Sequence, residues 1–353
     1  MPATTVLVVD DSALMRKMLR QILLDAGTFE VHTARNGVDA LEQIERVEPD
    51  VVTLDVNMPE MDGLSCLAEI MRSRPRPVVM VSSLTEDNAL VTLEALQLGA
   101  VDYVPKPGGT VSLNLADVTQ ELVRKVTSAA VTRPGRARGL RQRLRAQRER
   151  APVEAPPPRR GAARVELVLV GSSTGGPALL SELLPQLPGS LSAPVVVAQH
   201  IPATFTAPLA RRLDEVCQLR VHEVDRVMPM RPGNIYIGRG NADVVVARRV
   251  DGLVVKPVPA SGDYRWHPSV DRMVASARRS CDPSRLVCAL LTGMGDDGAA
   301  EIAAVRQAGG RTVAEAEETA VVWGMPGELA RRGGATAVLP SHAIVGQLVE
   351  WVN

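Results

Sequence analysis

Residues 167–177 read LVLVGSSTGGP, and this stretch decides the fold of the C-terminal half of the chain. Four consecutive apolar residues predict a short strand that is buried on both faces, as the strands of parallel sheets are. The Gly, Ser and Thr residues then predict a turn, and Pro177 suits the first turn of a helix, where its missing N–H loses no hydrogen bond. A serine on such a turn lies close to a helix N-terminus, whose amide groups favour negative charge.

The same alternation of apolar strands with helices continues in both directions from this stretch. We expect further strands at residues 6–9, 51–54, 78–81, 101–104, 195–198, 286–291 and 311–314. The pattern predicts an α/β protein with two parallel sheets, each covered by helices on both faces, the C-terminal one doubly wound. Residues 229–257 are interrupted by Gly and Asp and predict a β-hairpin insertion at an edge of the second sheet.

The composition changes between residues 127 and 163, where ten arginines and several prolines accompany only two glutamates. Too few apolar residues are present to form a core, so the segment is predicted to be a solvated linker, part helical and part extended. Its arginines would also suit a nucleic acid or an acidic surface. The predicted organisation is a domain at residues 1–126, a linker at 127–163 and a second domain at 164–353.

The bulk composition narrows the class of protein. The chain has 353 residues, enough for two cores, and 40 basic residues balance 40 acidic ones, so net charge gives no argument for nucleic acid or membrane binding. Only 2% of residues are aromatic, which argues against a base-stacking platform. The four cysteines show no CxxC spacing, and no apolar run approaches the ~18 residues of a membrane span. We expect a cytoplasmic protein that neither inserts into membranes nor binds nucleic acid.

Acidic residues follow two strands of the first predicted sheet. Asp10 and Asp11 follow the strand at 6–9, and Asp55 follows the strand at 51–54. Ligands collect at the carboxyl ends of parallel strands, where these carboxylates would converge and repel one another. A hard divalent cation such as Mg²⁺, which prefers oxygen ligands, resolves that repulsion, and the backbone carbonyl of Asn57 is a further candidate ligand. The sequence therefore predicts a magnesium site at this edge.

Asp55 is the candidate phosphoryl acceptor of this site. Ser82 and Lys106 follow the fourth and fifth strands, so they are expected at the same edge. Asp55 would attack a phosphoryl group in line while Mg²⁺ and Lys106 neutralise the developing charge.

These residues, with LDVNMP at 54–59 and VPKP at 104–107, make the first domain resemble the response-regulator receiver family. The resemblance implies a flavodoxin-like (βα)5 fold and phosphorylation of Asp55. It also implies that Ser82 contacts the phosphoryl group and that Tyr103 is a rotamer switch. The residues alone leave open that Tyr103 is a half-buried surface aromatic.

The second domain carries a candidate nucleophile, base and acid. Of five histidines, His200 alone directly follows a strand of the buried type, and Asp297 follows the run 286–291 and a Gly-Met-Gly turn. Ser173, His200 and Asp297 can therefore meet above the sheet, where Ser attacks, His transfers the proton and Asp fixes the His tautomer. Backbone N–H groups around Met294 are candidate oxyanion donors, each typically worth ~3–4 kcal/mol. The alternative interpretation is that Ser173 is a helix cap, His200 a core histidine and Asp297 a turn residue.

The chain order Ser, His, Asp differs from that of the α/β-hydrolases, subtilisin and chymotrypsin. The turn lacks GxGxxG, and no Lys follows it, which argues against nucleotide sites. With QHIP at 199–202, PSVD at 268–271 and LTGMGDDGA at 291–299, the whole chain resembles the CheB-type chemotaxis protein-glutamate methylesterase family.

By this resemblance the nucleophile is Ser173 rather than Ser172, the acid is Asp297 rather than Asp296, and Thr174 helps to orient the site. The resemblance implies hydrolysis of glutamate methyl esters on the cytoplasmic helices of methyl-accepting chemoreceptors, with release of methanol. It also implies deamidation of receptor glutamines, activation by a chemotaxis histidine kinase, and no cofactor for ester hydrolysis.

Two stretches depart from the family pattern: 238–243, GRGNAD, and 264–267, YRWH. We expect both at the rim of the site, where they bear on the substrate partner rather than on the chemistry. A phosphorylation-dependent scaffold without catalysis is a rival hypothesis, which an intact triad disfavours. A transcriptional regulator is a second rival, disfavoured because no helix-turn-helix pattern follows the first domain.

Overall fold

The computed structural model describes residues 3–83, 85–106, 115–132 and 165–353. The chain divides into two compact units, residues 1–149 and 150–353, which are described separately below. Most of the predicted linker lies outside the described residues. Its first residues belong to helix α5 (Leu115–Ala130), which continues past the predicted domain boundary at residue 126.

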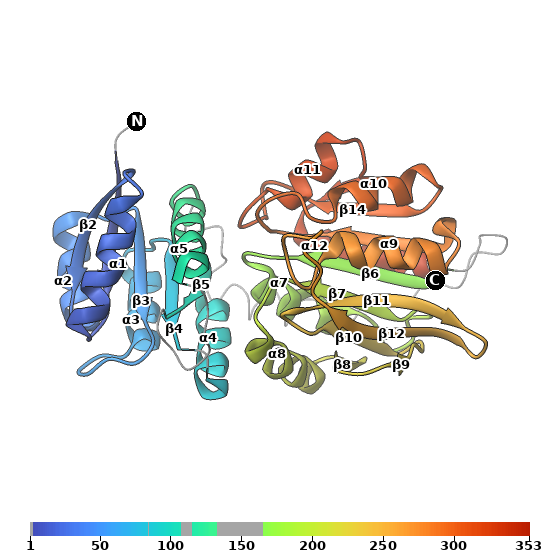
Figure 1. The fold of residues 1–353 in the computed structure, drawn as a ribbon, viewed down its shortest axis with the longest axis horizontal. Helices are drawn as coiled ribbons and strands as arrows, with labels where there is room; N and C mark the ends of the chain where they lie inside the picture. Colours follow the sequence, from blue (N-terminus) through green and yellow to red (C-terminus); the bar gives the residue numbers. More distant parts are fainter. Residues whose placement is uncertain (1–2, 84, 107–114, 133–164) are drawn as a thin grey trace. The chain divides into compact units, whose positions relative to one another are not determined.

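The first unit is a parallel sheet of five strands in the order β2-β1-β3-β4-β5 (Figure 1). The strands are β1 (Thr4–Val9), β2 (Phe29–Ala34), β3 (Val51–Asp55), β4 (Val78–Ser82) and β5 (Asp102–Pro105). The helices that alternate with them are α1 (Ala13–Asp25), α2 (Gly37–Val47), α3 (Gly63–Ser73), α4 (Glu86–Leu98) and α5. This strand order is that of flavodoxin-like folds and confirms the predicted fold.

Four of these helices begin where the sequence supplies a capping side chain. The N-cap residues Ser12, Asn36, Asp62 and Thr85 each accept a hydrogen bond from a backbone N–H in the first turn. Such caps satisfy amide groups that have no partner within the helix. The sheet beneath is apolar on both faces, since β3 and β4 are buried along their whole length.

The second unit contains a parallel sheet of seven strands in the order β15-β14-β13-β6-β7-β10-β8. The strands are β6 (Leu167–Ser172), β7 (Val195–Gln199), β8 (Arg220–Val224), β10 (Asn234–Gly238), β13 (Leu286–Leu290), β14 (Arg311–Glu315) and β15 (Ala337–Leu339). The helices are α7 (Gly176–Leu183), α8 (Ala203–Val216), α9 (Val270–Ser280), α10 (Ala299–Gln307), α11 (Met325–Arg331) and α12 (Ser341–Val352). The predicted doubly wound parallel sheet is confirmed.

The β-hairpin insertion is present, but its predicted position is wrong. Strands β11 (Ala242–Arg249) and β12 (Gly252–Pro259) form an antiparallel hairpin that joins β9 (Met228–Pro229) in a separate three-stranded sheet. The hairpin packs against α9, where Ser276 Oγ accepts a hydrogen bond of 2.9 Å from Val246 N (Figure 1). Strand β10, predicted within the insertion, instead pairs in parallel with β7 and β8.

Candidate active site

The turn after β6 places two serines in different environments. The Ser172 side chain is fully buried, and its Oγ donates a hydrogen bond of 2.6 Å to Gln199 Oε1. Ser173 follows the end of the strand, and its backbone N–H donates to Thr292 O at 2.9 Å. Its carbonyl accepts hydrogen bonds from Gly176 N and Gln199 Nε2 at 2.8 and 3.0 Å. The backbone of Ser173 is therefore held from both sides, while the Ser172 hydroxyl is already engaged.

Gln199 joins the serine turn to the residue that follows β7. Its Nε2 donates to the carbonyls of both Ser173 and His200, at 3.0 Å each. The His200 N–H in turn donates to Ser172 O at 3.0 Å. A side chain at Gly176 would meet the Gln199 amide, since a Cβ there would lie 2.0 Å from Oε1. Glycine at 176 is thus required for the amide to reach both loops.

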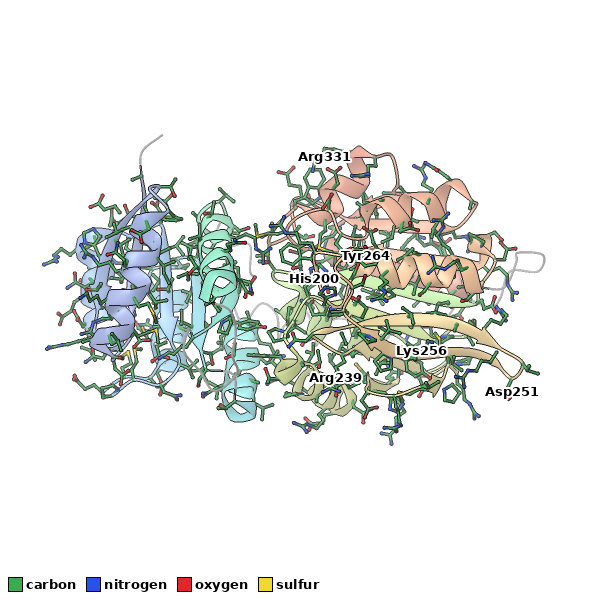
Figure 2. All side chains as sticks on the ribbon, in the orientation of Figure 1. His200, Arg239, Asp251, Lys256, Tyr264 and Arg331 are labelled. Carbon is green, nitrogen blue, oxygen red and sulfur yellow. The ribbon has the colours of Figure 1, made fainter. Side chains whose placement is uncertain are left out.

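His200, which is labelled in Figure 2, lies at the carboxyl edge of the sheet. It is in direct contact with Asp297. His200 Nε2 lies 2.8 Å from Asp297 Oδ2, and the two side chains are 8% and 7% exposed. Since a carboxylate only accepts hydrogen bonds, Nε2 carries the proton. Among the described residues, the buried Nδ1 has no hydrogen-bond partner, so its lone pair is available.

The N-terminus of α9 surrounds the Asp297 carboxylate with donors. Val270 N donates to Oδ2 at 2.7 Å, and Asp271 N donates to Oδ1 at 3.0 Å. The N-cap residue Ser269 adds a hydrogen bond of 3.0 Å from its Oγ. Burial alone would raise the pKa of Asp297, but His200 and these amides outweigh it and lower the pKa below its usual range. Asp297 is therefore held as an anion.

Asp296 has none of these contacts. Its side chain is 72% exposed and lies 4.0 Å from Arg332 Nη2. Sequence inspection found the motif at 268–271 but missed that it forms a helix N-terminus around Asp297. The capping signal of Ser269 was available, because a serine before an apolar helical run is a typical N-cap.

The turn 293–295 packs against Ser173. A Cβ at Gly293 would lie 2.7 Å from Ser173 Cβ, so the turn approaches the serine closely. Met294, the next residue, is partly buried. Thr174 is buried, and its carbonyl accepts a hydrogen bond of 2.9 Å from Thr292 Oγ1. Met294 therefore lies on a turn that contacts Ser173, and Thr174 belongs to the serine turn itself.

A buried glutamate accepts a hydrogen bond from the loop that begins at Thr292. Glu315, at the end of β14, accepts a hydrogen bond of 2.8 Å from Thr292 N and one of 3.0 Å from Thr319 Oγ1. Burial raises the pKa of this carboxyl to about 7, although the two hydrogen bonds oppose the shift. Glu315 could not be recognised from the sequence, because a single glutamate at a strand end resembles any loop residue.

Trp266 was also missed as a site residue. Its indole stacks on the His200 imidazole with ring centroids 5.6 Å apart and an interplanar angle of 19°. The stretch 264–267 was expected at the rim, but Trp266 lies against His200 itself.

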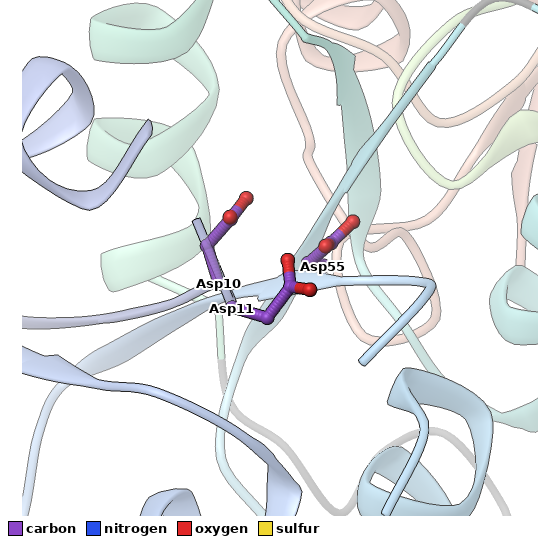
Figure 3. Close-up of side chains that lie close together, drawn as sticks. All are labelled: Asp10, Asp11 and Asp55. Carbon is purple, nitrogen blue, oxygen red and sulfur yellow. The ribbon is translucent and has the colours of Figure 1, made fainter. Parts of the chain in front are cut away.

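The acidic residues of the first unit converge as the sequence predicted (Figure 3). Asp10, Asp11 and Asp55 each offer a carboxylate oxygen, and these oxygens lie within 4.8 Å of one another. Lys106 Nζ lies 2.9 Å from Asp10 Oδ2 and 2.8 Å from Asp55 Oδ2. Three carboxylates facing one ammonium leave excess negative charge, and an all-oxygen cluster of this kind fits Mg²⁺.

The electrostatics of Asp55 follow from its burial. Burial raises the pKa of the Asp55 carboxyl, and Lys106 lowers it only in part. Burial opposes the charge of Lys106 as well, but its hydrogen bonds to Asp55 and Asp10 outweigh this and raise the lysine pKa. The ammonium therefore stays charged beside the carboxylates.

The other residues predicted around this site are placed as follows. Ser82 is buried at the end of β4, and its Oγ donates to Ser83 O at 3.3 Å. Tyr103 is buried rather than at the surface, with Lys125 Nζ 4.6 Å from the centroid of its ring. The Asn57 side chain donates to Asn88 Oδ1 at 3.1 Å.

Each of the two units matches a known protein family. The CheB methylesterase family matches residues 168–348, and the response regulator receiver domain matches residues 6–116. A protein-glutamate methylesterase/protein-glutamine glutaminase of Rhodospirillum rubrum is 53% identical over 357 residues, which cover 99% of this chain and 96% of that protein. One from Rhodopseudomonas palustris is 54% identical, covering 98% of each chain.

A solved structure supports the second unit in particular. The catalytic domain of Thermotoga maritima CheB methylesterase is 35% identical and aligns with 54% of this chain and 100% of its own, with a TM-score of 0.52. The two units thus define a response regulator whose second domain is a hydrolase. The chain belongs to the CheB methylesterase family. Of the helices in the described part of the chain, none is long and apolar enough to cross a membrane.

Proposed function

We propose that this chain is a protein-glutamate methylesterase and protein-glutamine glutaminase that acts on methyl-accepting chemoreceptors and is activated by phosphorylation of Asp55. Ser173, His200 and Asp297 are its nucleophile, base and acid. The observation that carries the proposal is the 2.8 Å contact between His200 Nε2 and Asp297 Oδ2 beside the serine turn. The relatives named above support the substrate class, because they are named protein-glutamate methylesterase/protein-glutamine glutaminase and align with this chain over 96% and 98% of their length.

In the proposed reaction, Ser173 Oγ attacks the carbonyl carbon of a glutamate methyl ester, and His200 Nδ1 takes the hydroxyl proton. The imidazolium is stabilised by the Asp297 carboxylate, which stays ionised. His200 then protonates the leaving oxygen, and methanol departs as the acyl-enzyme forms. His200 then deprotonates a water molecule, which attacks the acyl carbon. The bond to Ser173 Oγ breaks, His200 returns the proton to Ser173, and the receptor is left with a free glutamate side chain. With a glutamine substrate the same steps release ammonia.

The tetrahedral intermediate needs hydrogen-bond donors for its oxyanion. Backbone N–H groups around Met294 are the proposed donors, because the 293–295 turn approaches Ser173 closely. Thr174 is proposed to fix the turn through the hydrogen bond between its carbonyl and Thr292. The proposed hydrolysis uses no metal or cofactor, since the nucleophile, base and acid are all side chains.

In the first unit, Asp10, Asp11, Asp55 and the Asn57 carbonyl are the proposed ligands of Mg²⁺. When bound, the ion would neutralise charge on the incoming phosphoryl group. Asp55 is the phosphoryl acceptor, while Lys106 supplies a fixed positive charge to the phosphoryl oxygens. Ser82 is proposed to contact the phosphoryl group, and Tyr103 to change its rotamer on phosphorylation.

A chemotaxis histidine kinase in the cytoplasm is the proposed phosphodonor. The proposal divides the chain into a receiver at 1–126, a linker at 127–163 and a catalytic domain at 164–353. Membrane insertion and nucleic acid binding have no part in it.

The decisive experiment measures methanol release from methylated receptor cytoplasmic fragments, with and without acetyl phosphate and Mg²⁺. We expect activity in the wild type, stimulation by the phosphodonor, and loss of activity in Ser173→Ala. Ser181→Ala is the matched control, because that hydroxyl donates to Pro177 O within its own helix, α7. Asp55→Asn should keep basal activity and lose the stimulation. No turnover on any receptor, with Asp55 still phosphorylated, would support a non-catalytic scaffold instead.

A further inference from the structure

The loop before α9 places an aromatic ring on the proposed base. The centroid separation of 5.6 Å and the angle of 19° describe an offset stack between the Trp266 indole and the His200 imidazole. A cation within about 6 Å of a tryptophan ring centroid is attracted by the negative face of the ring. The imidazole lies within that distance, and in the proposed reaction it becomes a cation when it takes the proton of Ser173.

The position of Trp266 is fixed by the residues that follow it. The buried Asp243 side chain accepts hydrogen bonds from His267 Nδ1 at 3.0 Å, Ser269 N at 2.7 Å and Arg272 Nη1 at 2.6 Å. These contacts tie the loop to the start of α9, the same helix end that holds Asp297. On its other edge the indole reaches the 293–295 turn, because a Cβ at Gly295 would lie 3.8 Å from Trp266 Nε1.

A second cation approaches the same ring. The guanidinium of Arg265 lies 5.1 Å from the Trp266 centroid, but Arg265 is exposed to solvent. Cation–π attraction is weaker at exposed sites than at desolvated ones. The His200 side chain is only 8% exposed, so its contact with the ring is the stronger of the two.

We propose that Trp266 is a positioning residue for catalysis, whose ring face stabilises the imidazolium that His200 becomes when Ser173 gives up its proton. This inference rests on the proposed function. Asp297 stabilises the imidazolium in the plane of the ring through Nε2, while Trp266 acts on its face. The indole also covers one face of the His200 imidazole and keeps water from that face. The stacking fixes the plane of the imidazole ring and therefore the direction of Nδ1. Because the proposed reaction forms the imidazolium at the proton transfer from Ser173, the contact acts on kcat rather than on KM.

The test compares Trp266→Phe, which keeps a ring face, with Trp266→Leu, which keeps apolar volume without one. We expect Trp266→Leu to lower kcat roughly five- to thirtyfold with KM within about twofold, and Trp266→Phe to recover most of the loss. Arg265→Gln should change kcat less than about twofold. Trp351→Leu, on α12, is the control for removing a tryptophan.

Two readouts separate this inference from the proposed function. Methanol release measures turnover, and labelling of Ser173 by a fluorophosphonate measures activation of the nucleophile without any receptor substrate. Wild-type protein that labels at Ser173 but releases no methanol would contradict the proposed substrate, while the labelling rates would still test Trp266. Equal losses in the Phe and Leu variants, or a raised KM at unchanged kcat, would overturn the role assigned to Trp266. Circular dichroism establishes that each variant is folded.

Discussion

Asp297→Asn is the substitution whose consequences the structure defines most closely. Each carboxylate oxygen accepts two hydrogen bonds: Oδ2 from His200 Nε2 and Val270 N, and Oδ1 from Ser269 Oγ and Asp271 N. An asparagine has one carbonyl oxygen and one amide nitrogen, which only donates. Whichever way it is turned, its nitrogen faces a backbone N–H of α9.

The two orientations have different effects on the base. With nitrogen at the Oδ2 position, the amide donates to His200 Nε2, which moves the ring proton to Nδ1 and removes the base. With nitrogen at the Oδ1 position, Asp271 N loses its acceptor, and the charge that stabilises the imidazolium is still absent. Replacing the corresponding Asp in a serine protease triad lowers kcat about 10⁴-fold, and we expect a loss of that order here.

The same substitution lowers the free energy of unfolding. A buried N–H without an acceptor costs about 1–3 kcal/mol. Loss of a carboxylate from a helix N-terminus costs about another 0.3–2 kcal/mol. We therefore expect Asp297→Asn to be about 1–5 kcal/mol less stable at neutral pH. The loss should shrink on acidification, because the lowered pKa of Asp297 contributes stability that disappears as the carboxyl is protonated.

Methanol release and urea unfolding at pH 7 measure the two effects. Asp296→Asn is the matched control, since that neighbouring side chain is exposed and should leave both values unchanged. Fluorophosphonate labelling of Ser173 gives a second measure of activity if receptor turnover falls below detection. A folded Asp297→Asn protein with activity within tenfold of wild type would refute the role assigned to Asp297.

Four further outcomes are expected. Burial raises the Glu315 pKa from 4.5 to about 7, so this residue should lower the stability of the wild type by about 3 kcal/mol as pH rises from about 4.5 to above 7. Glu315→Gln should remove this contribution, and equal changes in the free energy of unfolding of wild type and Glu315→Gln between pH 5 and 8, measured in urea, would contradict it. Gly176→Ala should lose activity and at least about 1 kcal/mol of stability, because its Cβ would displace the Gln199 amide. Gly346→Ala, inside α12 with no atom within 4 Å of a Cβ, should gain about 0.5–1 kcal/mol by thermal unfolding. Asp11→Asn should weaken Mg²⁺ binding to the whole protein at least about tenfold by calorimetry, whereas the exposed Asp25→Asn should not.

Much of the fold followed from local sequence pattern. Strands such as β6 and β7 are apolar along their length, and strands of parallel sheets buried on both faces have this pattern. The strand ends then placed Asp10, Asp55 and His200 at carboxyl edges. Strand ends were predictable because a polar residue after an apolar run marks the point where the chain leaves the core.

The position of β10 could not be predicted in this way. Residues 234–238, NIYIG, are short and bounded by Gly and Asn, which suits a hairpin as well as a buried strand. Its assignment to the main sheet depends on parallel pairing with β7 and β8 on either side of it. Propensity carries no information about such pairing.

The residues missed around the site share the same physical reason. Trp266, Glu315 and Asp243 act through contacts with distant segments, and their neighbours in sequence give no chemical signal. Asp243 lies inside the stretch 238–243, one of the two departures from the family pattern, and Trp266 lies inside the other. Both departures therefore contribute to the same loop, because Asp243 accepts a hydrogen bond from His267 and the neighbouring Trp266 stacks on His200. The sequence analysis expected them to affect the substrate partner alone, but in the proposed function they also affect the base.

The two sites of this chain keep buried carboxylates charged by different means. Asp55 lies beside one ammonium, Lys106, which offsets its burial only in part, so its pKa remains raised. Asp297 has four donors, two of them amides at the start of α9, and its pKa is lowered despite burial. This difference matches the chemistry proposed for each. In the proposed function Asp55 reacts with a phosphoryl group, so it needs a cation that can be exchanged. Asp297 has to hold His200 in one tautomer through every turnover. Fixed backbone donors keep its carboxylate charged and in place without reorganising.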